Sequence, residues 1–156
     1  MTDKAAWERS VRGVDCPMDA PRPDVNDAWD WIAKLSVSSL YLAKNQTYRG
    51  QCVLIFDPRH AARPDQLEPR EWAAFCADLF AAQGAVMRAL RPDHINLESL
   101  GNVVPHLHFH VVPRYLGDAR WGAPIWLTAV ADMLETRLEP GDRAALIESL
   151  RKALAG

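Results

Sequence analysis

Three histidines stand at alternating positions within five residues, at His106, His108 and His110. They alternate with apolar side chains, which is typical of a β-strand with two different faces. Alternate side chains of a strand share a face, so we expect the three imidazoles to point the same way, about 6–7 Å apart. Six ring nitrogens then need hydrogen-bond partners, which makes packing alone a poor explanation. The pattern indicates chemistry at this strand.

Two kinds of chemistry suit the histidines. In the first, the central imidazole of His108 attacks as a nucleophile, while its other nitrogen donates to a fixed acceptor and the attacking nitrogen keeps its lone pair. His106 and His110 would then bind phosphate oxygens or supply a proton to the leaving group. In the second, the histidines hold a catalytic metal such as zinc. The nearest downstream acid, Asp118, lies beyond a proline, so a further ligand is not evident. We favour the nucleophile because it uses all three residues.

Composition places this chemistry in an ordinary globular protein. The 156 residues are most simply one domain, 1–156, large enough to bury a core. The 18 basic and 20 acidic residues nearly balance, which gives no sign of a nucleic-acid partner. No apolar run has the length of a membrane span and no signal peptide is visible. The three cysteines are scattered and odd in number, which argues against a disulfide framework and for a cytoplasmic location.

The elements that must position the histidines follow from periodicity. Residues 1–25 are expected to be irregular because of their three prolines, and 26–35 to form a short helix with apolar residues at helical spacing. Residues 38–44 and 51–56 predict a hairpin, and Glu68-Pro69 opens a long amphipathic helix that Pro92 ends. Strands at 94–97 and 106–112 follow, and 142–155 predicts a closing helix. This order favours an α+β fold on an antiparallel sheet.

The run His-Leu-His-Phe-His-Val-Val at 106–112 resembles the signature of the histidine-triad (HIT) family. The following Pro113-Arg114 is similar to the branch that contains bacterial diadenosine tetraphosphate hydrolases. The resemblance covers residues 36–118. It implies a five-stranded sheet with a long central helix and a C-terminal helix, usually paired as a homodimer. It also implies hydrolysis or nucleotidyl transfer at the α-phosphate of a dinucleoside polyphosphate or nucleoside phosphoramidate.

The same resemblance assigns roles. His108 would attack the α-phosphorus and form a nucleotidyl-histidine intermediate, His106 would orient it through its backbone carbonyl, and His110 would contact the phosphate. The residues implied to bind the substrate are His60, Asn96, Asn102, Asn45 and Arg114. Arg114 also has an ordinary alternative, which is an ion pair with Asp118.

The sequence departs from the family pattern at two places. A glutamine followed by serine or threonine often precedes the first histidine, where this chain has Asn102 and Val103, and valine cannot donate the hydrogen bond that serine or threonine would. Some relatives hold zinc through Cys-x-x-Cys, where this chain has Cys16 and Asp19. Loss of a soft thiolate weakens such a site, and we expect no structural zinc and no other cofactor.

The sequence therefore predicts an enzyme that acts on a small nucleotide through His108. Two alternatives remain open. One is a metal-dependent enzyme that uses the histidines as ligands. The other is a nucleotide-binding module without turnover, although such a module would not need a nucleophile.

Overall fold

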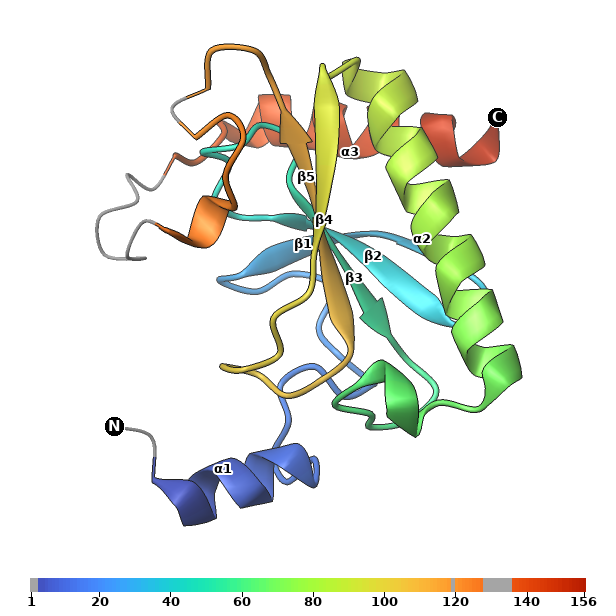
Figure 1. The fold of residues 1–156 in the computed structure, drawn as a ribbon. Helices are drawn as coiled ribbons and strands as arrows, with labels where there is room; N and C mark the ends of the chain where they lie inside the picture. The colour runs from blue at the N-terminus through green and yellow to red at the C-terminus, as the bar shows by residue number, and fades with distance from the viewer. Residues whose placement is uncertain (1–2, 119, 128–135) are drawn as a thin grey trace.

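A single antiparallel sheet organises the computed structural model, which describes residues 3–118, 120–127 and 136–156 (Figure 1). Its five strands lie in the order β1-β2-β3-β5-β4. The strands are β1 Trp29–Lys34, β2 Ser38–Ala43, β3 Cys52–Phe56, β4 His94–Glu98 and β5 His108–Arg114. The helices are α1 Lys4–Val11, α2 Pro69–Leu90 and α3 Pro140–Ala155, with short 3-10 turns η1 Pro64–Gln66 and η2 Ile125–Leu127. The α+β class predicted from the sequence is confirmed.

The two faces of the sheet are covered by different parts of the chain. Helices α2 and α3 pack against one face and against each other, and bury the main core of aliphatic and aromatic side chains (Figure 1). The opposite face carries a second apolar cluster of Met18, Trp29, Tyr41, Val53 and Ile55. His108 pairs with Ile55 and His110 with Val53 across the β3–β5 ladder, so both imidazoles lie on this second face. The helix layer therefore supports one face of the sheet, and the free face carries His108 and His110.

Helix α2 begins and ends as its sequence predicts. Pro69 occupies the first turn, and Glu68 and Glu71 cap one another's backbone there. Arg91 takes a left-handed conformation at the C-terminal end, just before Pro92. By length and composition this helix could cross a membrane, although no membrane span was expected from the sequence. Its apolar stripe, however, packs into the main core, as in the central helix of a globular domain.

The helix predicted at 26–35 is wrong, because these residues form strand β1. Trp29 and Ile32 are three apart and looked helical, but a β-bulge between Trp31 and Ala33 shifts the register there. Trp29 lies on the free face and Ile32 on the helix-covered face, as residues three apart do in any strand, and beyond the bulge Ala33 also packs on the helix-covered face. Pairing with β2 and the β preference of tryptophan and isoleucine outweigh the weak helical spacing.

The expectation that residues 1–25 are irregular is also wrong in part. Asp3 accepts a hydrogen bond from the backbone N–H of Ala5 and starts helix α1, which runs to Val11. The prolines come only after this helix, from Pro17 onward. The segment that follows α1 then lies against the apolar cluster on the free face of the sheet.

Candidate active site

His108 and His110 are held by the central part of the sheet. Strand β5 begins at His108 and is flanked by β3 on one side and β4 on the other. The two imidazole rings lie 5.1 Å apart, edge to face. The prediction that these two histidines share a face is confirmed, and a strand with neighbours on both sides gives them a rigid base.

His108 has the hydrogen bond that a nucleophilic imidazole needs. Its Nδ1–H donates to the backbone carbonyl of His106 at 2.6 Å, within a buried setting. A neutral ring with its proton on Nδ1 keeps the lone pair on Nε2. Burial lowers the pKa of His108, and the bond to His106 only partly opposes this shift. The ring is therefore neutral near pH 7 and its Nε2 is free to attack.

His110 is neutral for a related reason. Burial, followed by the neighbouring His108, lowers its pKa to about 4. Its Nδ1 is buried with no hydrogen-bond partner in the described chain. The ring of Trp126 packs edge to face against it at 4.8 Å. His110 thus offers a neutral ring beside His108.

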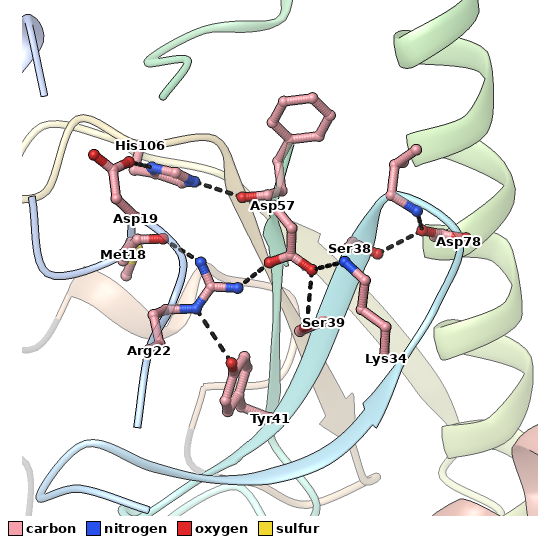
Figure 2. A network of polar contacts seen from close by, with 12 residues as sticks. Met18, Asp19, Arg22, Lys34, Ser38, Ser39, Tyr41, Asp57, Asp78 and His106 are labelled. Atoms are coloured by element: carbon pink, nitrogen blue, oxygen red, sulfur yellow. Dashed lines mark hydrogen bonds and ion pairs between the residues drawn. The ribbon is translucent and has the colours of Figure 1, made fainter. Parts of the chain in front are cut away.

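The side chain of His106 and its backbone carbonyl make contacts in two different places. The sequence predicted all three imidazoles on one face of one strand, but His106 precedes β5 and lies outside its ladder. Its Nε2–H donates to the carbonyl of Phe56 at 2.7 Å, and its Nδ1 lies 3.0 Å from Asp19 Oδ1 (Figure 2). Only its backbone carbonyl faces His108. Burial is the main cause of its lowered pKa.

Asp19 gathers a second group of polar side chains, which we call the N-terminal cluster: Cys16, Asp19, His60 and His106. One ligand atom from each lies within 4.8 Å of the others. His60 Nδ1 is 3.1 Å from the same Asp19 oxygen, while its Nε2 is 3.1 Å from the carbonyl of Val11. Both histidines are therefore bonded to carbonyls through Nε2 and point Nδ1 at a carboxylate.

That arrangement fits a cation. A neutral imidazole that donates through Nε2 has only a lone pair on Nδ1, and a carboxylate oxygen also only accepts. Two such acceptors facing Asp19 need a proton or a metal ion between them. One thiolate, one carboxylate and two imidazoles form a donor set that zinc accepts in tetrahedral sites. The structure does not test the expectation of no zinc, and the residues present fit the ion.

An ion pair anchors the segment that carries Cys16 and Asp19. Arg22 contacts the carboxylate of Asp57, the carbonyl of Met18 and the hydroxyl of Tyr41 (Figure 2). The side chains of Arg22 and Asp57 are only 2% and 8% exposed. Asp57 follows β3 directly, so this pair fixes the segment against the sheet beside His106.

The other predicted binding residues are scattered. Asn96 lies on β4, its Nδ2 bonded to Glu98 Oε1 at 3.0 Å. Asn45 lies in the β2–β3 loop and accepts from Thr47, and Asn102 is exposed in the loop before β5. These contacts within the protein do not bear on substrate binding, so the roles of Asn96, Asn45 and Asn102 stay predictions. His60 has both ring nitrogens engaged in the N-terminal cluster, which gives it another role in this structure.

Arg114 has the ordinary partner that its sequence context allowed. Its Nε and Nη2 bond to the two carboxylate oxygens of Asp118 at 2.8 and 2.7 Å. It also donates to the carbonyls of Arg120 and Ala123. The pair holds the pKa of Asp118 below its usual range, chiefly through the hydrogen bond. Arg114 thus ties the chain after β5 into a closed loop.

Sequence reasoning missed three residues that surround the histidines: Asp19, Arg22 and Glu98. Asp19 was noted only as a replaced cysteine. Glu98 is the Cα partner of His110 in the β4–β5 ladder, a relation that the predicted hairpin register could have revealed. The ring contact of Trp126 and the ion pair of Arg22 join distant parts of the chain and left no local signal.

Comparison with known proteins decides the family. The sequence profile of the HIT domain matches residues 38–117. The chain belongs to the HIT domain family. The match begins and ends close to the limits that the resemblance gave, and it contains both His108 and His110. The specific branch of diadenosine tetraphosphate hydrolases is not separated from other HIT proteins by this match.

Solved HIT structures share this fold. A histidine triad protein from Bradyrhizobium japonicum is 24% identical, with a TM-score of 0.74 over 81% of this chain and 91% of its own. One from Marinobacter aquaeolei VT8 is 20% identical, with a TM-score of 0.73 over 82% and 90%. A zinc-bound histidine triad family protein from Mycobacterium smegmatis is 25% identical, with a TM-score of 0.55 over 80% and 83%. No curated protein matches the chain.

The depressed pKa of His110 predicts how stability of this HIT protein depends on pH. In the folded protein the ring protonates near pH 4, but in the unfolded chain it protonates near pH 6.5. The unfolded state therefore binds more protons between these values, and stability falls as pH falls through this window. We expect His110 to make the free energy of unfolding about 2 kcal/mol lower at pH 5 than at pH 7. Urea unfolding at both pH values measures the loss, which should be smaller by that amount in His110→Asn. Equal losses in the two proteins would contradict the assignment.

Proposed function

We propose that this HIT protein transfers or hydrolyses the nucleotidyl group of a small nucleotide, with His108 as the nucleophile. One observation carries the proposal. The Nδ1–H of His108 is fixed on the His106 carbonyl, which leaves a neutral Nε2 beside His110 on the free face of the sheet. A positioned, neutral imidazole is what covalent catalysis at phosphorus requires.

The residues present support a two-step reaction. In the first step Nε2 of His108 forms a bond to the α-phosphorus while the bond from phosphorus to the leaving group breaks, and the leaving group takes the bonding pair. In the second, water attacks the same phosphorus, the P–N bond breaks, and the nucleoside monophosphate leaves with release of a proton. The Nδ1–H bond to His106 stabilises the positive charge that His108 carries between the two steps.

The finer assignment is a dinucleoside polyphosphate or a nucleoside phosphoramidate as substrate. Intact-protein mass spectrometry after rapid mixing with diadenosine tetraphosphate and with adenosine 5′-phosphoramidate tests it. We expect an added adenylyl group on the parent and none on His108→Ala. A parent that forms no adduct and turns over neither compound would contradict the proposal and favour the binding-module alternative.

The metal-dependent alternative loses support from the fold. A catalytic metal held by the three triad histidines needs their rings to converge, but the His106 ring is engaged in the N-terminal cluster. Among the described residues, the group with metal-ligand geometry is that cluster, and it includes neither His108 nor His110.

A structural zinc in the N-terminal cluster is a separate proposal. The paired acceptors around Asp19 support it, as does the zinc bound by the mycobacterial relative. When bound, the ion would supply positive charge to Asp19 and to the two imidazoles. We expect elemental analysis to find about one zinc per chain, and Cys16→Ala to weaken zinc binding at least tenfold. Cys76→Ala, on helix α2, is the matched control and should keep its zinc. Equal zinc content in parent and Cys16→Ala would remove the proposal.

We also propose that the protein forms a homodimer along β4. This strand is an edge of the sheet, and an unpaired edge invites a second copy. Leu97 on the strand and Leu100 just beyond it are exposed. A cytoplasmic location, which the free cysteines support, completes the proposal. Light scattering of the purified protein measures the mass directly, and a monomer at working concentration would contradict the dimer.

A further inference from the structure

His110 and Trp126 are in contact, and each carries a buried nitrogen without a partner. In the described part of the chain, His110 Nδ1 and Trp126 Nε1 are among the buried side-chain atoms that make no hydrogen bond. The two rings pack edge to face, with their centroids 4.8 Å apart. A buried polar atom without a partner is destabilising, and such atoms are rare in folded proteins. Two of them in one ring contact point to a hydrogen bond between them.

The two nitrogens match in only one tautomer of His110. The indole Nε1–H of Trp126 can only donate. His110 is a neutral ring, so one of its nitrogens carries a proton and the other carries a lone pair. With the proton on Nε2, the lone pair of Nδ1 can accept from Trp126. With the proton on Nδ1, two donors would be buried in one contact without an acceptor. The contact with Trp126 therefore favours the Nε2–H form.

The neighbouring carboxylate of Glu98 is directed elsewhere. Glu98 is the Cα partner of His110 in the β4–β5 ladder, and one of its own oxygens is buried without a hydrogen bond. Its charge acts on Arg114, whose pKa is raised by Asp118 first and by Glu98 as well. The pKa of His110 is lowered chiefly by burial, and Glu98 does not contribute to that shift. This leaves Trp126 as the partner for His110 Nδ1.

The segment that carries Trp126 is fixed to the strand that carries His110. Arg114, at the end of β5, donates to two backbone carbonyls of this segment. Ile125, next to Trp126 in η2, is buried in one apolar cluster with Val112 of β5. The backbone before Trp126 is thus held at two points, and side-chain rotation within the existing ring contact can form the hydrogen bond.

The other ring nitrogen of His110 is open to the site. Among the described residues nothing bonds to Nε2, and this nitrogen is not one of the buried atoms without a partner, so solvent reaches it. The ring lies 5.1 Å from that of His108. An Nε2–H would donate to a phosphate oxygen of a nucleotide at His108, whereas a lone pair there would repel that oxygen. The tautomer therefore decides whether His110 favours or opposes phosphate binding.

We propose that Trp126 is a positioning residue, whose indole N–H bonds to Nδ1 of His110 and keeps the ring proton on Nε2, where it donates to the phosphate. This inference rests on the proposed nucleotidyl chemistry at His108 and deepens it. Trp126 contacts neither the phosphorus nor the leaving group, and it acts only through His110. A phenyl ring at position 126 would keep the packing and lose this effect.

Nitrogen-15 NMR of the full-length protein at pH 7 tests the tautomer without any substrate. The chemical shifts of the two ring nitrogens distinguish Nε2–H from Nδ1–H, and His110→Asn identifies the signals. We expect Nε2–H in the parent, with a coupling across the hydrogen bond between Trp126 Nε1 and His110 Nδ1. In Trp126→Phe the ring should become a mixture of tautomers. Trp121→Phe changes an exposed tryptophan that precedes η2, and this control should keep the parental His110 signals.

Kinetics with adenosine 5′-phosphoramidate tests whether the tautomer matters for the reaction. We expect Trp126→Phe to lower kcat/KM about tenfold, because a hydrogen bond to a charged group is worth about a factor of ten or more. In a His110→Asn background the same change should cost almost nothing, since the ring on which Trp126 acts is gone. Trp121→Phe should stay within about twofold of its parent in both backgrounds.

Three kinds of result would overturn the role of Trp126. One is Nδ1–H in the parent, or no coupling between the two nitrogens, and both can be observed even if Trp126→Phe does not fold. Another is an Nε2–H form that persists unchanged in Trp126→Phe, because another group would then set the tautomer. The third is an equal loss of activity in both backgrounds, which would mean a structural role. A parent that turns over no phosphoramidate and forms no adenylyl adduct would instead remove the proposed function, and with it this role, whatever the tautomer.

Discussion

Replacing His108 with alanine is expected to lower kcat/KM for adenosine 5′-phosphoramidate by about 10⁴-fold or more, because covalent catalysis loses its nucleophile. The loss should appear in kcat, since the bond that His108 forms to phosphorus exists only along the reaction. Steady-state kinetics measures both constants. The fold should survive, because the sheet around β5 is held by pairing on both sides.

His94→Ala is the matched control for this experiment. His94 is an exposed histidine at the far end of β4 and has no place in the proposed chemistry. We expect its activity to stay within about twofold of the parent, since exposed substitutions rarely disturb a fold. A His108→Ala variant that keeps more than a hundredth of the parental activity would show that another group attacks.

The second large effect concerns stability. Asp57→Ala is expected to destabilise the protein by about 3–5 kcal/mol, because it leaves the buried guanidinium of Arg22 without its counter-charge. Asp57 also accepts from Lys34 and from Ser39, and these bonds are lost as well (Figure 2). For a domain of this size the loss corresponds to a fall in Tm of about 10 °C. Thermal unfolding followed by circular dichroism measures it.

Arg22→Ala should cost less than Asp57→Ala. The remaining carboxylate still has Lys34 and the hydroxyl of Ser39, whereas Arg22 alone has only a carbonyl and a tyrosine hydroxyl. The double variant should be less damaging than the sum of the two, because each single change leaves a charge stranded that the other removes. Equal and additive losses would mean that the two side chains do not interact.

The parts of the fold that local pattern controls were predictable. Strand β3 is a short continuous apolar run, and helix α2 carries apolar residues at helical spacing over its whole length. The residues at the start of α2 are also ones that commonly begin a helix. Strand β1 was not predictable in the same way, because its apolar residues Trp29 and Ile32 stand at a helical interval and its bulge interrupts the regular alternation of a strand. Its identity depends on β2, a partner that no local window contains.

The candidate site, too, was predictable only where a local pattern places its residues. Alternation in 106–112 was enough to predict that His108 and His110 are neighbours, because strand geometry alone places them. It failed for His106, since the strand begins two residues later than the pattern implied. The carboxylate of Asp19 reaches His106 across nearly ninety positions of sequence, and such contacts depend on the whole fold.

The backbone and the side chain of His106 have different structural roles. Its carbonyl oxygen accepts from Nδ1–H of His108, and any amino acid at position 106 would supply that oxygen. Its imidazole binds the end of β3 and the N-terminal segment, where only a histidine can make both contacts. At this position the contact with His108 therefore depends on backbone placement, whereas the imidazole contributes to the architecture of the chain. In this protein, the imidazole of the first triad histidine therefore joins the N-terminal segment to the end of β3.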